Sequence, residues 1–222
     1  METDKLIDAL IADAKPVRRL APPMMRALWW LVVAAVIVAI ISLLHGLRPD
    51  LGAKLDDSQF VMQILAAAAT GVLAGIAAFQ LSLPDRSTAW AALPLPALAV
   101  WFSVVGYGCL TDWVSLDADS IRLGRAADCL ATLVVTSVPL WLLLIIMLRR
   151  AAPMSRVISA LTASLAVAAV TAAAMSLYHD LDATIMVLMW NVGTAALVIG
   201  LGRAFGPRLL NRAQAMPDLR AA

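Results

Sequence analysis

Charged side chains are scarce in this chain of 222 residues. Asp, Glu, Lys and Arg together account for 14% of it, against about 25% in a typical soluble domain. Hydrophobic residues account for 62%, which is more apolar surface than a soluble domain of this size can keep away from water. Disordered chains are poor in apolar residues, so the composition excludes disorder as well. It predicts a protein whose solvent is a lipid bilayer.

Motifs of several enzyme classes are also missing. The sequence contains no GxxxxGK[ST] phosphate loop, no GxGxxG following a strand, no HExxH helix and no GxSxG turn. Its two cysteines are too few for a disulfide scaffold. We therefore expect a protein that is not an enzyme, with no catalytic residues and no cofactor.

What the sequence does contain is six long apolar runs. A helix needs about 20 apolar residues to cross a bilayer, whereas a barrel strand needs only about 10 in alternation. The runs cover approximately residues 27–47, 60–80, 88–108, 129–148, 157–178 and 183–204. They predict an all-α fold, an integral membrane bundle of six transmembrane helices. We expect residues 1–25 and 207–222 to form cytoplasmic segments on either side of a transmembrane domain at 26–206.

The cationic residues predict how this bundle is oriented. With six spans, 13 of the 17 Lys and Arg residues fall on the side that carries both termini. Loops rich in Lys and Arg stay in the cytoplasm, so both termini are expected there. The other face holds nine aspartates, which are Asp50, Asp56, Asp57, Asp112, Asp117, Asp119, Asp128, Asp180 and Asp182.

Inside the predicted spans, polar groups are few and uncharged. Eight of them are expected mainly to form hydrogen bonds between helices: Gln63, Thr136, Ser137, Thr162, Ser164, Thr171, Asn191 and Thr194. Pro94, Pro96 and Pro139 are expected to kink the third and fourth spans. Gly71 and Gly75 form a GxxxG pair, which predicts close packing either within the bundle or between subunits of a homo-oligomer.

All the cysteines and histidines fall at the outer ends of predicted spans. Cys109 ends the third span, Cys129 begins the fourth, and His45 and His179 end the first and the fifth. Cys and His are ligands for thiophilic and borderline metals, which makes these four residues a candidate metal site. Cys109 and Cys129 could instead form a disulfide, because an outer face is oxidising. A third interpretation is two ordinary small cysteines and two interfacial histidines.

The first residues predict a short amphipathic helix that Pro16 stops. Its apolar stripe consists of Leu6, Ile7, Leu10 and Ile11, and Asp4, Lys5 and Asp8 cover the opposite face. A helix this short is marginal alone in water, so it needs a surface on which to bury its stripe. Its acidic face disfavours anionic lipid. A groove on a protein partner is the better candidate, although the helix could also pack back on its own bundle.

Several stretches of the sequence resemble one membrane-protein family. They are Met1–Leu10, Ala14–Leu20, Gly46–Leu51, Leu83–Ser87 and Met147–Ala151, and their order and spacing are similar to those of the NrsF family over essentially the whole chain. The resemblance implies a six-span inner-membrane anti-sigma factor. Such a protein holds an extracytoplasmic-function (ECF) sigma factor at the cytoplasmic face until a signal arrives from outside.

The same resemblance implies a pair of periplasmic cysteines that respond to heavy-metal or oxidative stress. Cys129 looks like the first of them. The family's second cysteine falls beside a His after the fifth span, where this chain has His179 followed by Asp180. Cys109 would then be the substitute partner of Cys129 in redox sensing.

Two other classes of function remain open from the residues themselves. A small transporter or channel subunit would need a polar path near Gln63, Pro94 and Asn191, and the lack of charge within the spans argues against it. A membrane enzyme at the outer face would use His45, His179 and the aspartates as acid–base groups. Direct binding to nucleic acid is not expected, because the topology alone explains the scattered cations.

Overall fold

The computed structural model describes residues 20–112, 123–149 and 156–178, together with the single positions Thr3, Lys5 and Asp8. Within these residues the fold is all-helical, as predicted. Five helices are long and apolar enough to cross a membrane: α2 (Pro23–His45), α4 (Ser58–Leu81), α5 (Leu95–Asp112), α6 (Leu123–Leu148) and α7 (Arg156–Tyr178). They confirm five of the predicted spans. The sixth span, at residues 183–204, lies outside the described residues.

Two short elements were not expected from the sequence. Helix α3 (Leu51–Leu55) lies between α2 and α4, and the 3₁₀ helix η1 (Thr88–Ala92) precedes α5. The third span is therefore interrupted rather than kinked. Pro94 lies in the turn after η1, and its carbonyl accepts from Leu98 N at 2.9 Å, so α5 starts immediately after it. Pro96 then lies in the first turn of α5, where a proline costs no hydrogen bond.

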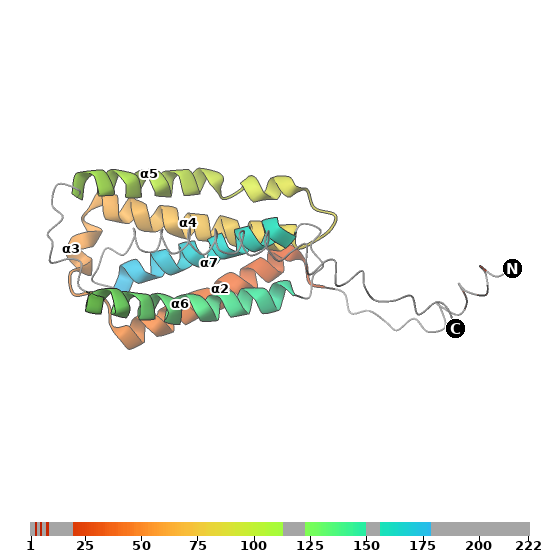
Figure 1. Cartoon of the computed structure of the whole chain (residues 1–222), viewed down its shortest axis with the longest axis horizontal. Helices are drawn as coiled ribbons and strands as arrows, with labels where there is room; N and C mark the ends of the chain where they lie inside the picture. Colours follow the sequence, from red (N-terminus) through yellow and green to blue (C-terminus); the bar gives the residue numbers. More distant parts are fainter. Residues whose placement is uncertain are drawn as a thin grey trace.

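Successive long helices run antiparallel, and α4 and α7 form the centre of the bundle (Figure 1). Helix α5 packs on α4, while α2 and α6 pack on each other and on the central pair. We call one end of the bundle the basic end, because it holds Arg26, Arg86 and Arg149. Helices α2 and α7 begin there, and α4 and α6 end there. At the other end, which we call the acidic end, lie His45, Asp50, Asp56 and Asp57.

The GxxxG pair explains why α4 packs so closely within the bundle. A Cβ added to Gly71 would lie 2.7 Å from Val170 Cγ2 and 3.1 Å from Val170 N on α7. A Cβ added to Gly75 would lie 2.8 Å from the ring of Trp30 on α2. Both glycines therefore pack against helices of the same chain. Of the two alternatives predicted for the GxxxG pair, the contacts favour close packing within the bundle over packing between subunits.

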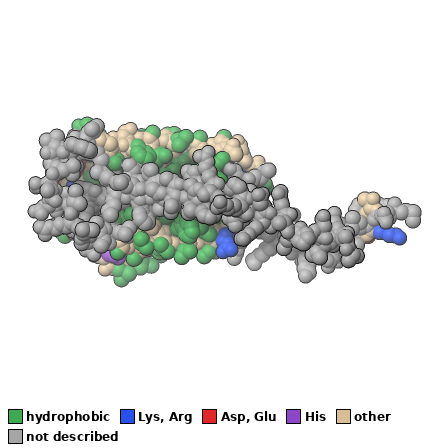
Figure 2. Space-filling view, viewed as in Figure 1, with side chains coloured by type: hydrophobic (Ala, Val, Ile, Leu, Met, Phe, Trp, Pro, Cys, Tyr) green, Lys and Arg blue, Asp and Glu red, His purple; other side chains and the backbone are tan. Residues whose placement is uncertain are grey.

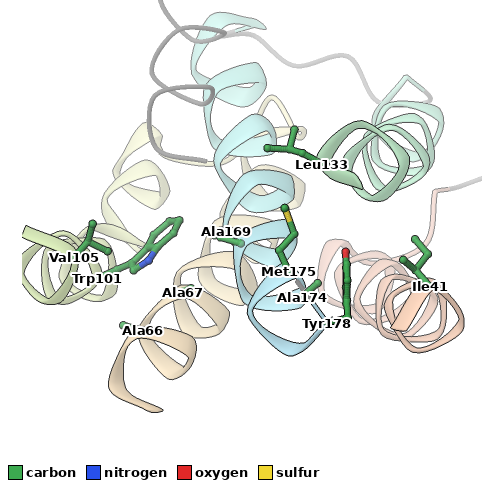
Figure 3. Close-up of a cluster of buried hydrophobic side chains, with 11 residues drawn as sticks. Ile41, Ala66, Ala67, Trp101, Val105, Leu133, Ala169, Ala174, Met175 and Tyr178 are labelled. Atoms are coloured by element: carbon green, nitrogen blue, oxygen red, sulfur yellow. The ribbon is translucent and has the colours of Figure 1, made fainter. Parts of the chain in front are cut away.

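Apolar side chains both fill the bundle and cover its flank. One buried cluster draws on all five long helices, with Trp101 of α5 beside the alanines of α4 and α7 (Figure 3). On the visible flank, apolar side chains lie between the two ends of the bundle (Figure 2). Leu43, Leu65 and Trp29 are each at least 60% exposed. So much exposed apolar surface fits lipid and not water.

Candidate functional site

Three of the four predicted metal and redox residues lie in helices that the structure describes, but it describes the side chain of only one of them. His45 is the last residue of α2, Cys109 belongs to α5, and Cys129 belongs to α6. The two cysteine side chains and the whole of His179 lie outside the described residues. Among the residues that the structure does describe, no group of three metal-ligating side chains comes together.

The two cysteine-bearing helices are not a packed pair. Helix α5 lies against α4, whereas α6 lies against α7 and α2, and the central helices separate them in Figure 1. A disulfide requires Cα atoms within about 7 Å. The disulfide between Cys109 and Cys129 therefore stays a prediction that depends on how the outer ends of these two helices approach each other.

His45 belongs to a polar chain that links three helices at the acidic end. Its Nδ1 lies 3.1 Å from the carbonyl of Ile41. The centroid of its ring lies 5.5 Å from that of Tyr178, the last residue of α7, and the two rings are tilted by 35°. The Tyr178 hydroxyl in turn lies 2.6 Å from the hydroxyl of Thr136 on α6. Tyr178, visible beside the buried cluster in Figure 3, thus connects α2 to α6 through α7.

A buried arginine fixes the neighbouring loop between α2 and α3. Gly46 follows the last residue of α2 and has φ +79°, a conformation that favours glycine. The side chain of Arg48 is only 3% exposed. It donates from Nε and a terminal nitrogen to the two carboxylate oxygens of Asp50 at 2.6 and 2.9 Å, and it lies over the ring of Phe60 at 5.5 Å. This donation lowers the pKa of Asp50 below its usual value.

The same loop is tied to the end of α7 by its backbone. Arg48 N donates to the carbonyl of Leu177 at 3.2 Å, one residue before Tyr178. The acidic end thus joins α2, α6 and α7 through the His45–Tyr178–Thr136 chain and the Arg48 loop. A change in this loop or at the end of α7 would be felt by all three helices.

The candidate partner-binding residues lie almost entirely outside the described part of the chain. Of Leu6, Ile7, Leu10, Ile11, Asp4 and Asp8, only Asp8 is described. Together with Thr3 and Lys5 it is helical and exposed. Both the polar face and the apolar stripe of this segment remain predictions.

At the basic end, a second buried arginine joins three helices. Arg26 lies in the first turn of α2 and is only 7% exposed. Its guanidinium donates to the backbone carbonyl of Met147 in the last turn of α6 and, at 3.4 Å, to Oγ of Ser82, which follows α4. It also lies over the ring of Phe79 on α4, 5.2 Å from the centroid. Among the described residues, no carboxylate lies within ion-pair distance of Arg26.

Trp30, one turn after Arg26, also contacts both α6 and α4. Its Nε1 lies 3.5 Å from the carbonyl of Leu140 on α6, and its ring covers Gly75 on α4. Arg26 and Trp30, four residues apart on α2, thus meet Phe79 and Gly75, four residues apart on the antiparallel α4. This i, i+4 spacing places each pair on one helix face.

Among the described residues, two of the threonines predicted to link helices form no hydrogen bond to another helix. Thr136 bridges α6 and α7 as expected, but Thr162 returns its hydrogen bonds to its own helix, at Ile158 O and Ser159 O. Thr171 Oγ1 is buried and has no partner among the described residues. Instead Ser159 of α7, which the sequence did not single out, donates to the carbonyl of Leu81 on α4 at 3.1 Å.

From the sequence, Arg26 and Arg48 were interpreted only as cations that indicate topology, and their burial was not predicted. One signal for Arg48 was available, since Asp50 follows two residues later and Pro49 favours a turn. Nothing local marked Arg26, because its acceptors come from residues 56 and 121 positions away.

Comparison with known proteins gives one family. Searches of curated proteins and of solved structures give no match to this chain. The NrsF family, described as negative regulator of sigma F, matches residues 10–211. Its description implies a regulator of transcription with a sigma factor as partner, which fits the sequence resemblance and favours a role other than catalysis. The match spans nearly the whole helical bundle, and the chain therefore belongs to the NrsF family of membrane anti-sigma factors.

Proposed function

We propose that this protein is a multi-pass protein of the bacterial inner membrane that sequesters an ECF sigma factor at its basic, cytoplasmic end. The observation that carries the proposal is the family match over residues 10–211, on a bundle with several exposed apolar helix faces. The 13 cations on the side of the termini favour a cytoplasmic basic end. A cytoplasmic sigma factor can reach only that end.

The amino-terminal segment, residues 1–25, is the proposed sigma-binding element. It offers an apolar stripe of Leu6, Ile7, Leu10 and Ile11, and its exposed polar positions Lys5 and Asp8 leave that stripe for a partner groove. The proposed signal is heavy-metal or oxidative stress outside the membrane, received by Cys109 and Cys129. The acidic end, where their helices meet the outer loops, would receive it first.

Co-purification tests the sigma-binding role. Full-length protein is extracted from membranes with and without residues 1–20, and soluble proteins bound to it are identified. Recovery of a sigma factor that depends on residues 1–20 supports both the function and the proposed binding segment. Leu10→Asp should abolish recovery, whereas Thr3→Ala, at an exposed position of the same segment, should not.

Other outcomes separate the parts of the proposal. A sigma factor recovered without residues 1–20 would keep the function and move the contact to other cytoplasmic parts of the chain. If no soluble protein is recovered at all, sigma sequestration is wrong. The thiol-sensing part fails separately if a Cys109→Ser, Cys129→Ser double variant still releases transcription on exposure to metals and oxidants.

A further inference from the structure

We propose that Arg26 is a positioning residue that couples the last turn of α6 to the base of the amino-terminal segment, and so controls whether that segment retains its sigma factor. The inference rests on the proposed function and adds the element that carries the signal. It names one side chain through which the bundle and the segment communicate.

Arg26 has the right place in the chain for this role. It follows directly on residues 1–25, and its helix begins at Pro23, after Pro22 as an N-cap that makes no side-chain hydrogen bond. The guanidinium holds Met147 of α6 and Ser82 after α4 at once, while Phe79 covers it. The start of α2, to which the segment is joined, is therefore held by the ends of α4 and α6.

The chemistry of its partners makes this contact easy to change. A buried cation normally has a carboxylate partner, because burial removes its water. The acceptors of Arg26 among the described residues are a carbonyl, a hydroxyl and an aromatic face, which are all neutral. Neutral acceptors give weaker hydrogen bonds than a carboxylate does. A long arginine at the end of a span can also reach phosphate and water at the membrane surface. Exchanging these acceptors for phosphate or water should therefore change the free energy of Arg26 little, as a switch requires.

Helix α6 supplies the path from the acidic end. Its backbone runs without a break from Leu123 to Leu148, so Cys129 and Met147 lie about 27 Å apart along one helix. Between them, Thr136 is tied to Tyr178 and Trp30 reaches Leu140. Pro139 removes one hydrogen bond in the middle of this path, which gives α6 a place to bend. A shift at the acidic end would thus move the Met147 carbonyl away from Arg26.

The test compares Arg26→Met and Arg26→Lys with Arg86→Met, which removes an exposed cation at the same end. Each full-length protein is produced in cells, and three quantities are measured. They are its amount in the membrane, the rate of trypsin cleavage after Arg18 and Arg19 in inverted vesicles, and sigma-dependent transcription without stress.

At an unchanged amount of protein, Arg26→Met should raise both the cleavage rate and unstressed transcription about tenfold, because two charge-assisted hydrogen bonds are lost. Arg26→Lys keeps the charge but not the fork of donors, so it should give a smaller rise in both. Arg86→Met should match the wild type. A purely structural role would instead lower the amount of protein in the membrane.

The inference is overturned if Arg26→Met is present at the normal amount with wild-type cleavage and transcription. If that variant does not accumulate, Arg26→Lys decides, and wild-type values for it overturn the inference equally. Failure of the proposed function looks different, because the wild-type chain itself would then retain no sigma factor.

Discussion

Arg26 and Arg48 show how a few side chains organise a bundle that is otherwise apolar. Each is buried at one end of the bundle and lies over a phenylalanine of α4, and each joins segments that are distant in the sequence. Arg48 has a carboxylate partner and Arg26 has none among the described residues. Arg48 therefore fixes its loop, whereas Arg26 is poised to change partners.

Gly71 is predicted to be intolerant of even one methyl group. In Gly71→Ala the new Cβ would meet the backbone nitrogen of Val170 at 3.1 Å as well as its side chain at 2.7 Å, and backbone cannot move aside cheaply. We expect a loss of about 1–3 kcal/mol in the free energy of unfolding, measured by denaturant unfolding in detergent. Gly106→Ala in α5 is the matched control, because nothing lies within 4 Å of its added Cβ. Equal stabilities of the two variants would contradict the packing described for α4 and α7.

The Arg48–Asp50 pair predicts a dependence of stability on pH. Arg48 lowers the pKa of Asp50 in the folded protein, so the pair stabilises the fold above the pKa of the unfolded chain. This stabilisation is lost as the pH falls through the lowered pKa. Asp50→Asn should melt at a lower temperature near neutral pH and lose less on acidification than the wild type. Asp56→Asn, at an exposed carboxylate of the same region, should behave like the wild type, and identical pH profiles for all three proteins would refute the pair's role.

At the scale of elements, the contact between α6 and α7 depends on one pair of hydroxyls. Thr136→Val and Tyr178→Phe each remove the 2.6 Å hydrogen bond, and each should cost about 0.6–2 kcal/mol of unfolding free energy. In the double variant the losses should not add, because both changes remove the same bond. A double-variant cycle of unfolding measurements checks this, and strictly additive losses would show that the two hydroxyls do not interact.

The elements also show how far the sequence could be interpreted. Hydropathy located five spans to within a few residues, because length and apolar content are sufficient for that. Pro94 was recognised as a perturbation, but whether it kinks a helix or separates two pieces depends on the turn that follows Ser87. The link from Thr136 to Tyr178 joins residues 42 positions apart, and no local pattern encodes it. The family motif at residues 46–51 acquired a physical meaning only when the structure showed Gly46 turning the chain and Arg48 binding Asp50.

For the whole molecule, the antiparallel arrangement places Arg26, Arg86 and Arg149 together at one end of the bundle. The positive-inside rule then predicts that this end faces the cytoplasm. In a variant without native cysteines, Ser87→Cys should react with a membrane-impermeant maleimide only after cells are opened. Asp56→Cys should react in intact spheroplasts. The reverse pattern would invert the orientation and leave a cytoplasmic sigma factor with access only to the acidic end.

Sequestration of a sigma factor at the membrane can be measured in cells. The most direct measurement is the fraction of that sigma factor found in the membrane pellet, in cells with and without the protein and before and after metal or oxidative stress. We expect the sigma factor to sediment with membranes only when the protein is present. On stress, the sigma factor should move to the soluble fraction while the protein remains in the membrane pellet. A sigma factor that is equally soluble in all four conditions would contradict this expectation.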